Sequence, residues 1–395
     1  MDEIKNSVLI GDCAKSLKQF SDETFDCIVT DPPYGIKFMG RKWDKALPSL
    51  DALNECCSVL KSGALAFFMC APRMDVLWRM GEKLEKAGFE IDFSFIAWAQ
   101  AQGFPKSKNM SNVSEKLNGA FAGNQLKPAI EVIIVCMKPL SEKSFTEQAL
   151  KNGHGVTWLN DCKIPTNENL NGGAYAKNPI AREDAWSNLR KGDINVFKRG
   201  GAGEYEQPEG RFPANLLVCD DALNDGINHT TGTMNSIAKH DYDNTICYGK
   251  INPVRSIVNK SEGSFSRYFD LDAWWDKKIS ELPENIQKTF PVIVVPKAST
   301  AEKNKYCENK HQTVKPLKLM SYLITMGSRE GDLILDPYCG SGTTLEAANL
   351  LGRRFVGCEL DEAHRELIEA RAYMQNVKNV DIVSNVNESS LDDWI

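Results

Sequence analysis

Short apolar runs alternate with amphipathic stretches along the first third of the chain. The runs are rich in β-branched and aromatic residues and predict buried strands, whereas the stretches between them carry apolar residues at helical spacing. An alternation of strand and helix builds a parallel sheet, so this part of the chain predicts an α/β fold. We expect strands at 4–12, 26–30, 64–70, 93–99 and 130–137, and helices at 13–20, 49–62 and 73–87.

The alternation stops near residue 140 and returns near residue 290. Between these points Gly, Asn and other polar residues dominate, which is typical of a loop-rich inserted domain or of partly disordered sequence. Aromatic residues such as Trp158 and Trp274 favour a packed domain, because disordered segments contain few of them. We therefore expect an α/β domain in two parts, 1–140 and 291–395, separated by an inserted region at 141–290.

The final part of the chain regains the α/β pattern. One predicted helix carries apolar residues at helical spacing, among them Leu319 and Leu323, and another is expected at 345–351, where Gly352 follows as a typical helix stop. The predicted strands of this part cover 291–295, 332–336 and 355–359.

Composition and charge narrow the class of protein. The 395 residues are 42% hydrophobic and 25% charged, which is ordinary for a globular protein. No apolar run reaches membrane-spanning length and the amino terminus lacks the layout of a signal peptide, so we expect a cytoplasmic protein that contacts no membrane. The net charge of −6 argues against binding nucleic acid by overall charge, and any contact with a polyanion must come from local patches.

Cysteine and histidine give no sign of a metal site. The chain has 12 Cys without any C-x-x-C pair, and its 5 His are scattered. This spacing indicates neither zinc ligands nor a disulfide framework. We expect packed, reduced thiols and no bound metal.

The first candidate site motif is Asp31-Pro32-Pro33-Tyr34-Gly35, directly after the strand at 26–30. Each proline fixes its own φ and keeps the preceding residue extended, so the motif forms a stiff arm. The arm presents a carboxylate, a carbonyl and an aromatic ring at the edge where open α/β sheets bind ligands. An ordinary strand-to-loop exit is the alternative interpretation, because Asp, Pro and Gly are common turn residues.

The second motif, Gly340-Ser341-Gly342, follows the strand at 332–336 and precedes a helix. Glycines at such a turn let the backbone approach a ligand closely, and Glu359 lies 359 − 340 = 19 residues after the first glycine, near the ~20 of a ribose-binding acid. Leu345 occupies the place of a third glycine, which disfavours a dinucleotide site, and no P-loop pattern is present. The layout therefore predicts a nucleoside-cofactor site.

Together the two motifs resemble those of the amino-DNA methyltransferases with the permuted, β-class motif order. The resemblance rests on Asp31-Pro32-Pro33-Tyr34 and on the run from Leu335 to Thr344. It extends to Gly11-Asp12, the 131–138 strand, the His311 to Pro316 element and Gly357-Cys358-Glu359. The segment 210–216 in the long middle region is similar to phage-type members. The resemblance implies a Rossmann-like methyltransferase fold with a mixed, mostly parallel sheet, S-adenosylmethionine as cofactor, double-stranded DNA as partner and an inserted target-recognition region.

The resemblance also implies catalytic roles. Asp31 and the carbonyl of Pro32 would accept hydrogen bonds from an exocyclic amine of a flipped-out base, and Pro33 would stiffen the arm. Tyr34 would stack on the base. Adenine N6 is the expected target because the Asp form of the motif is associated with adenine more than with cytosine N4.

The cofactor-binding residues follow from the same resemblance. Gly340 and Gly342 would approach the cofactor by backbone, with Thr343 beside them, and Glu359 would bind the ribose. The other expected contacts are Asp12 at the adenine end, Thr313 and Lys315 at the methionine carboxylate, and Asp336 and Tyr338 in the turn. Each of these residues could instead have a purely structural role. Asp12 could cap a helix, Glu359 could be an acid at a strand end and Lys315 could be a solvated lysine. Asp336 could hold the backbone of the turn, and Tyr338 could serve in packing.

Several functional alternatives are open at this stage. The first motif could equally serve methylation of cytosine N4, of RNA or of a protein side-chain amide. A catalytically inactive homologue that binds nucleic acid would also keep the fold. A nicotinamide oxidoreductase is disfavoured by the incomplete glycine pattern. The polar, basic loop at 102–110 is either a solvated connection or a loop that closes over a bound polymer. The sequence leaves the oligomeric state open, a homodimer being one option.

Overall fold

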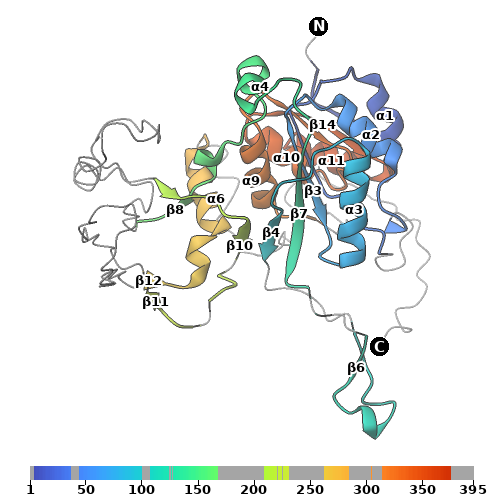
Figure 1. The fold of residues 1–395 in the computed structure, drawn as a ribbon, viewed down its shortest axis with the longest axis vertical. Coiled ribbons are helices and arrows are strands. Elements are labelled where there is room, and N and C mark those ends of the chain that lie inside the picture. The colour runs from blue at the N-terminus through green and yellow to red at the C-terminus, as the bar shows by residue number, and fades with distance from the viewer. Residues whose placement is uncertain are drawn as a thin grey trace, which may run out of the picture.

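A computed structural model shows one continuous sheet at the centre of the molecule (Figure 1). The structure describes residues 4–36, 44–99, 107–123, 126, 128–167, 209–219, 221–224, 226–230, 262–283, 304 and 314–374.

The sheet has eight strands in the order β1-β14-β13-β2-β3-β7-β4-β10. All neighbours are parallel except those of β7, which runs antiparallel to both β3 and β4. The carboxyl ends of β1, β14, β13, β2 and β3 therefore lie along one edge, together with the amino end of β7. The strands are β1 (Ser7–Ile10), β2 (Cys27–Thr30), β3 (Leu65–Cys70), β4 (Ile96–Ala99), β7 (Ile130–Met137), β10 (Leu216–Val218), β13 (Leu333–Asp336) and β14 (Arg354–Glu359).

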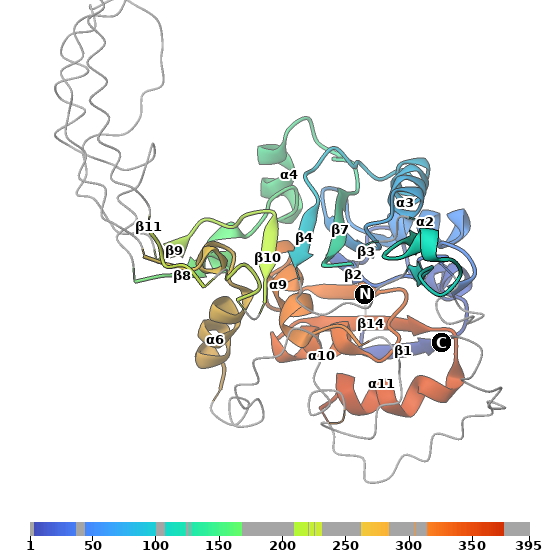
Figure 2. The same cartoon turned by 90° about the horizontal axis from the view of Figure 1, so that it is seen from below.

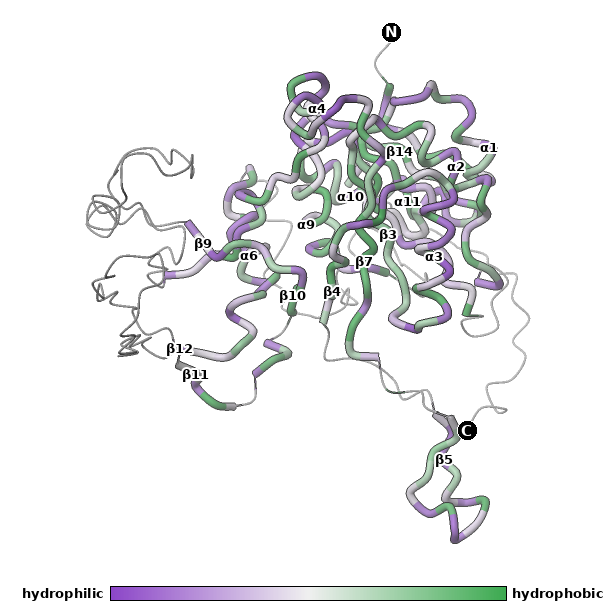
Figure 3. The backbone as a smooth tube through the Cα atoms, in the orientation of Figure 1, coloured by the Kyte–Doolittle hydropathy of each residue, from purple (hydrophilic) through white to green (hydrophobic). Residues whose placement is uncertain are grey.

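Helices cover both faces of the sheet (Figure 2). The central strands β2, β3 and β13 are buried at every position, as expected of strands with two covered faces, and Figure 3 shows the apolar stretches gathered in the strands. One face carries α1 (Cys13–Ser16), α2 (Leu50–Val59) and α3 (Met74–Lys86), and the other carries α9 (Leu317–Gly327), α10 (Thr343–Leu350) and α11 (Arg365–Ala372).

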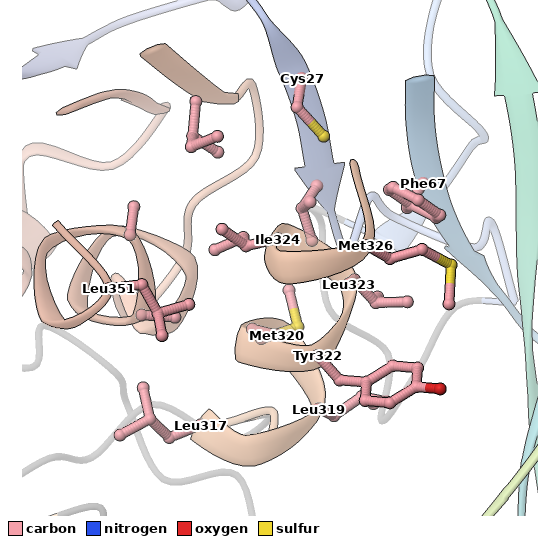
Figure 4. Packing of buried hydrophobic residues seen from close by; sticks show 14 of the residues in the cluster. Cys27, Phe67, Leu317, Leu319, Met320, Tyr322, Leu323, Ile324, Met326 and Leu351 are labelled. Atoms are coloured by element: carbon pink, nitrogen blue, oxygen red, sulfur yellow. The ribbon is translucent and has the colours of Figure 1, made fainter. Parts of the chain in front are cut away.

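The packing of α9 on the sheet is close (Figure 4). All of its residues are buried, and a Cβ added at Gly327 would lie 2.8 Å from Cys27 Sγ of β2 and 2.8 Å from Phe67 of β3. Burying each large apolar side chain of this helix contributes roughly 1.5–3 kcal/mol. The helix is thus fixed against the centre of the sheet, and the residues that precede it are brought to the sheet edge.

The predicted α/β fold is confirmed, with corrections at the ends of elements. Helix α2 ends at Val59 rather than at residue 62, because Leu60 turns extended and forms a bridge with Phe25. Helix α10 begins at Thr343, two residues before the predicted start, because Gly342 serves as its N-cap. The predicted strand at 291–295 lies outside the described residues.

Part of the region 141–290 packs directly on the main domain. Strand β10 joins the edge of the sheet beside β4, which the sequence did not predict. The Trp274 indole donates to the carbonyl of Asp161 at 2.8 Å and its ring meets Tyr322 of α9 at 4.8 Å. The three-segment division itself stays a prediction. Described elements here are α4 (Phe145–Asn152), β8 (Ile164–Pro165), β9 (Gly210–Arg211), β11 (His229–Thr230), β12 (Glu262–Gly263), α6 (Leu271–Glu281) and the short 3-10 helices Leu159–Cys162 and Phe265–Tyr268.

A small hairpin projects from the body of the molecule between β4 and β7 (Figure 1). It pairs β5 (Lys108–Asn109) with β6 (Phe121–Ala122) in antiparallel register. Phe121 and Val113 are exposed on it. The hairpin contains the end of the loop at 102–110, whose role as a solvated connection or a polymer-binding loop stays open.

No helix in the described part of the chain combines the length and the apolar character needed to cross a bilayer. The ten cysteines that the structure describes are unbonded and buried, which confirms for them the prediction of packed thiols. Among the same described residues no group of three or more His, Cys, Asp or Glu side chains is arranged to hold a metal ion.

Candidate active site

Four acidic residues stand side by side at one edge of the sheet. Asp12 follows β1, Glu359 ends β14, Asp336 ends β13 and Asp31 follows β2, and these four strands are neighbours in that order. All four strands are parallel, so their carboxyl ends meet. The two sequence motifs, about three hundred residues apart along the chain, therefore lie next to each other across β13 and β2.

A buried hydrogen bond ties the two motifs together. The hydroxyl of Thr30, the last residue of β2, donates to Asp336 Oδ1 at 2.6 Å. Both side chains are almost completely buried, and Tyr338 N also donates to Asp336 Oδ1 at 3.1 Å. Asp336 thus holds the backbone of the turn, which agrees with the structural role given as its alternative. Burial raises the pKa of Asp336 to about 6.

The arm that carries Asp31 is fixed at its far end. Gly35 has φ +68 and donates its N–H to Asp44 Oδ1 at 2.7 Å. A Cβ at Gly35 would lie 2.9 Å from the backbone nitrogen of Leu47, so only glycine fits this turn. Asp44 is buried and was not predicted as a site residue. The stiffness expected from the two prolines is therefore reinforced by a hydrogen bond at the end of the arm.

Both oxygens of Asp31 accept hydrogen bonds from neighbouring side chains. Tyr34 Oη donates to Oδ1 at 2.7 Å, and Lys315 Nζ donates to Oδ2 at 2.6 Å. Glu131, at the amino end of β7, lies 3.2 Å from Lys315 Nζ and 3.5 Å from Tyr34 Oη. These four residues, Asp31, Tyr34, Glu131 and Lys315, are called the carboxylate cluster below.

Electrostatics keep the two donors of the cluster protonated. Burial alone would lower the pKa of Lys315, but the carboxylates of Asp31 and Glu131 outweigh burial and raise it above its usual range. Burial and the same two carboxylates raise the pKa of Tyr34. At neutral pH the lysine is therefore cationic and the tyrosine keeps its proton. Sequence reasoning placed Lys315 at the cofactor, whereas the structure pairs it with Asp31.

The glycine turn has the backbone shape predicted for close approach to a ligand. Gly340 and Gly342 have φ +52 and +80, values that residues with a Cβ rarely adopt. A Cβ at Gly342 would lie 3.1 Å from Ile368 Cγ2, so the turn is also packed tightly from below. The turn leads into the amino terminus of α10, where backbone N–H groups point outward. This bare backbone fits a nucleoside cofactor.

Glu359 holds the turn from the neighbouring strand. Its Oε2 accepts from Gly340 N at 3.0 Å, and its Oε1 accepts from Asp361 N at 3.0 Å. His364 Nδ1 lies 3.4 Å from the same Oε1, and this contact raises the pKa of the histidine. A carboxylate has about four acceptor positions, so Glu359 keeps capacity for ribose hydroxyls.

A buried cation, Arg371 of α11, supports the turn from the core, and the sequence did not reveal it. Arg371 is 1% exposed, forms an ion pair with Glu346 at 2.7 Å and donates to Ser341 Oγ at 2.9 Å. It also donates to Thr343 Oγ1 at 3.0 Å. The hydroxyl of Thr343 is therefore turned into the core, while its backbone remains in the turn. The sequence signal that could have revealed this pair is the position of two charged residues, Glu346 and Arg371, on otherwise apolar helix faces.

Two of the remaining predicted residues, Asp12 and Tyr338, have structural partners of their own. Asp12 is exposed and caps α1, accepting from Ala14 N at 3.1 Å. Tyr338 packs against the core and hydrogen bonds to Cys13, and burial raises its pKa. Thr313 lies outside the described residues. The assigned cofactor contacts of these residues stay predictions.

The fold and the edge site define a class, the nucleoside-cofactor-dependent α/β enzymes with an acidic residue beside the cofactor turn. Residues 25–370 match the family model described as DNA methylase, which covers amino-methyltransferases acting at N6 or N4. The chain belongs to this family. The resemblance to the DNA amino-methyltransferases that the two motifs predicted is thereby confirmed as family membership.

Individual relatives match over shorter segments. The chain is 32% identical over 164 residues to the Type II methyltransferase M2.MboI of Moraxella bovis, covering 37% of this chain and 56% of the relative. It is 41% identical over 70 residues to the Type II methyltransferase M2.DpnII of Streptococcus pneumoniae, covering 18% of this chain and 26% of the relative. The matches thus span about half or less of the curated relatives.

Solved structures are similar at low sequence identity. The PvuII DNA methyltransferase, described as cytosine-N4-specific, aligns with a TM-score of 0.43 at 14% identity and covers 96% of this chain and 89% of its own. A putative DNA modification methylase from Thermus thermophilus, in complex with S-adenosyl-L-methionine, aligns with a TM-score of 0.40 at 16% identity over 93% of this chain and 94% of its own.

Proposed function

We propose that this protein methylates adenine N6 in double-stranded DNA, with S-adenosylmethionine as methyl donor. The observation that carries the proposal is the adjacency of the two motifs: Asp31 stands one strand away from the glycine turn, and the Thr30–Asp336 bond joins them. An acceptor for an amine and a cradle for a nucleoside thus share one sheet edge. Family membership supports the same chemistry.

The cofactor would be held by groups along this edge. The backbone at Gly340 and Gly342 would contact its nucleoside part, Glu359 the ribose and Asp12 the adenine end. Thr313 and Lys315 are the candidates for its carboxylate. S-adenosylmethionine supplies an electrophilic methyl group when it is bound.

The chain's own groups would act on the amine. The exocyclic nitrogen of adenine is a poor nucleophile because its lone pair is delocalised into the ring. The Asp31 carboxylate and the Pro32 carbonyl can accept hydrogen bonds from its two N–H groups, which favours a pyramidal nitrogen and stabilises the positive charge that develops on it. The proton can leave after transfer, so Asp31 need not be a strong base. Tyr34 would contact the flipped-out base, at an unstacking cost of a few kcal/mol.

The base and the polymer are tested together by nucleoside analysis. Unmethylated double-stranded DNA, RNA and protein are each incubated with the enzyme and S-adenosylmethionine carrying a labelled methyl group, then hydrolysed for mass spectrometry. We expect the label in N6-methyladenine from DNA. Label in N4-methylcytosine would contradict the choice of adenine, and label confined to RNA or protein would contradict the choice of DNA.

A further inference from the structure

Glu131 is a second carboxylate in the cluster around Asp31, and no role follows for it from the proposed chemistry. It stands near the start of β7, on the sheet face that the buried residues Ile133 and Met137 share with α9. Its side chain is 20% exposed. A carboxylate at the end of such an apolar strand face loses hydration, and its retention there requires compensating partners. Its partners include Lys315 and Tyr34.

These two partners are the same groups that bind Asp31. Lys315 Nζ lies 2.6 Å from Asp31 Oδ2 and 3.2 Å from Glu131 Oε2. Tyr34 Oη lies 2.7 Å from Asp31 Oδ1 and 3.5 Å from Glu131 Oε2. Glu131 therefore pairs with the Lys315 ammonium and lies beside the Tyr34 hydroxyl, whose single proton goes to Asp31. Glu131 is thus linked to Asp31 by Lys315, which pairs with both carboxylates.

We propose that Glu131 is a positioning residue for methyl transfer, acting on Asp31 through Lys315 and Tyr34. By holding the Lys315 ammonium and lying against the Tyr34 hydroxyl it fixes the plane of the Asp31 carboxylate, so that the remaining acceptor positions keep one direction toward the target amine. The three elements involved are the β2 arm, β7 and the segment before α9, and none of them alone fixes this plane. The proposal rests on the proposed function of Asp31.

The charge of the cluster gives Glu131 a second effect on the same step. Two carboxylates against one ammonium leave one net negative charge beside the reacting amine. Positive charge develops on that amine during transfer, and a fixed negative charge at a partly buried site stabilises it. Without Glu131 the Lys315 ammonium would cancel the charge of Asp31.

The test compares E131Q with a matched control, E90Q. Gln keeps the size of Glu131 but removes its charge, and Glu90 pairs through its backbone with Met137 at the opposite end of β7. We expect E131Q to lower kcat roughly 10- to 100-fold, the size of loss known for hydrogen-bond partners of metal ligands, which orient a reactive group in the same way. At saturating cofactor KM for DNA should stay within about twofold, and E90Q should match the wild type. E131D, which keeps the charge, should retain more activity than E131Q.

A double-mutant cycle with K315M separates positioning from a structural role. If Glu131 acts through Lys315, E131Q should reduce kcat much less in the K315M background than in the wild type. An E131Q enzyme within twofold of the wild-type kcat, or an equal loss in both backgrounds, would overturn the inference. D31A is measured alongside: an inactive D31A with unaffected E131Q refutes only the role of Glu131, whereas a fully active D31A refutes the proposed function as well.

Discussion

Neighbouring aspartates at this sheet edge differ in chemistry because their surroundings differ. Asp31 is partly exposed and accepts from Lys315 and Tyr34, which suits a group that must meet a substrate. Asp336 is buried beside it and accepts from Thr30. The sequence identifies both acids at strand ends, but only packing decides which one faces a ligand and which one holds the turn.

The raised pKa of Asp336 predicts a pH-dependent cost to stability. Between about pH 4 and pH 6 the unfolded chain ionises this group while the folded protein keeps its proton, because the folded pKa is about 6 against an ordinary 3.8. The folded state then binds more protons, so the free energy of unfolding falls as pH rises through this window. D336N keeps the Oδ1 acceptor and removes the titration. Its stability relative to wild type, from urea unfolding, should increase from pH 4 to pH 6 and then level off; a difference independent of pH would refute this.

The turn glycines make a second prediction at this scale. Gly342→Ala should cost roughly 1–2 kcal/mol for the left-handed backbone, and more because Ile368 crowds the new Cβ. Gly331→Ala is the control, since its φ is +84 but no atom lies within 4 Å of a Cβ. We expect Gly342→Ala to be the less stable variant in urea and to weaken cofactor binding in calorimetry. Equal stability and unchanged binding would contradict the close approach.

At the scale of elements, the main strands and the helices that cover the sheet were largely predictable from the sequence. The edge strand β10 and the long-range side-chain contacts that hold the site were not. Continuous apolar runs predict buried strands such as β3 and β7, and Gly88 predicts the end of α3. Strand β10 has only three residues inside a polar region, too few for a periodic signal. Glu131 and Arg371 acquire partners far away in sequence, which no local pattern encodes.

The Arg371–Glu346 pair joins α11 to α10 beneath the glycine turn. R371M should destabilise the protein by about 3–5 kcal/mol, because it leaves the buried Glu346 carboxylate without its cation. The double variant R371M/E346M removes both charges and should recover part of this loss. Thermal and urea unfolding of the two variants provide the measurement. A double variant no more stable than R371M would show that the unpaired carboxylate is not the cause.

At the scale of the whole molecule, the net charge of −6 limits how the proposed DNA substrate can be bound. We propose that phosphate contacts come from local groups such as those on the projecting β5–β6 hairpin. The described part of the region 141–290 packs on α9 through Trp274 and joins the edge of the sheet through β10. We propose that it lies where it can read a bound duplex, a role that the sequence predicted from resemblance alone.

The charge balance predicts modest DNA affinity that weakens with salt. Each phosphate neutralised by Lys or Arg contributes about −0.9 to the slope of log affinity against log salt concentration. We expect a clear negative slope in fluorescence anisotropy titrations of a duplex from about 50 to 200 mM salt. An affinity that stays flat over this range would contradict binding through phosphate contacts.

The central claim is that Asp31 acts on the amine while the adjacent turn holds the methyl donor. The most direct measurement follows the wild type and D31A in parallel, with cofactor binding by calorimetry and methyl transfer to DNA from labelled S-adenosylmethionine. We predict that D31A binds the cofactor within a few fold of the wild type and transfers no methyl group. Full methyl transfer by a folded D31A protein would contradict the account.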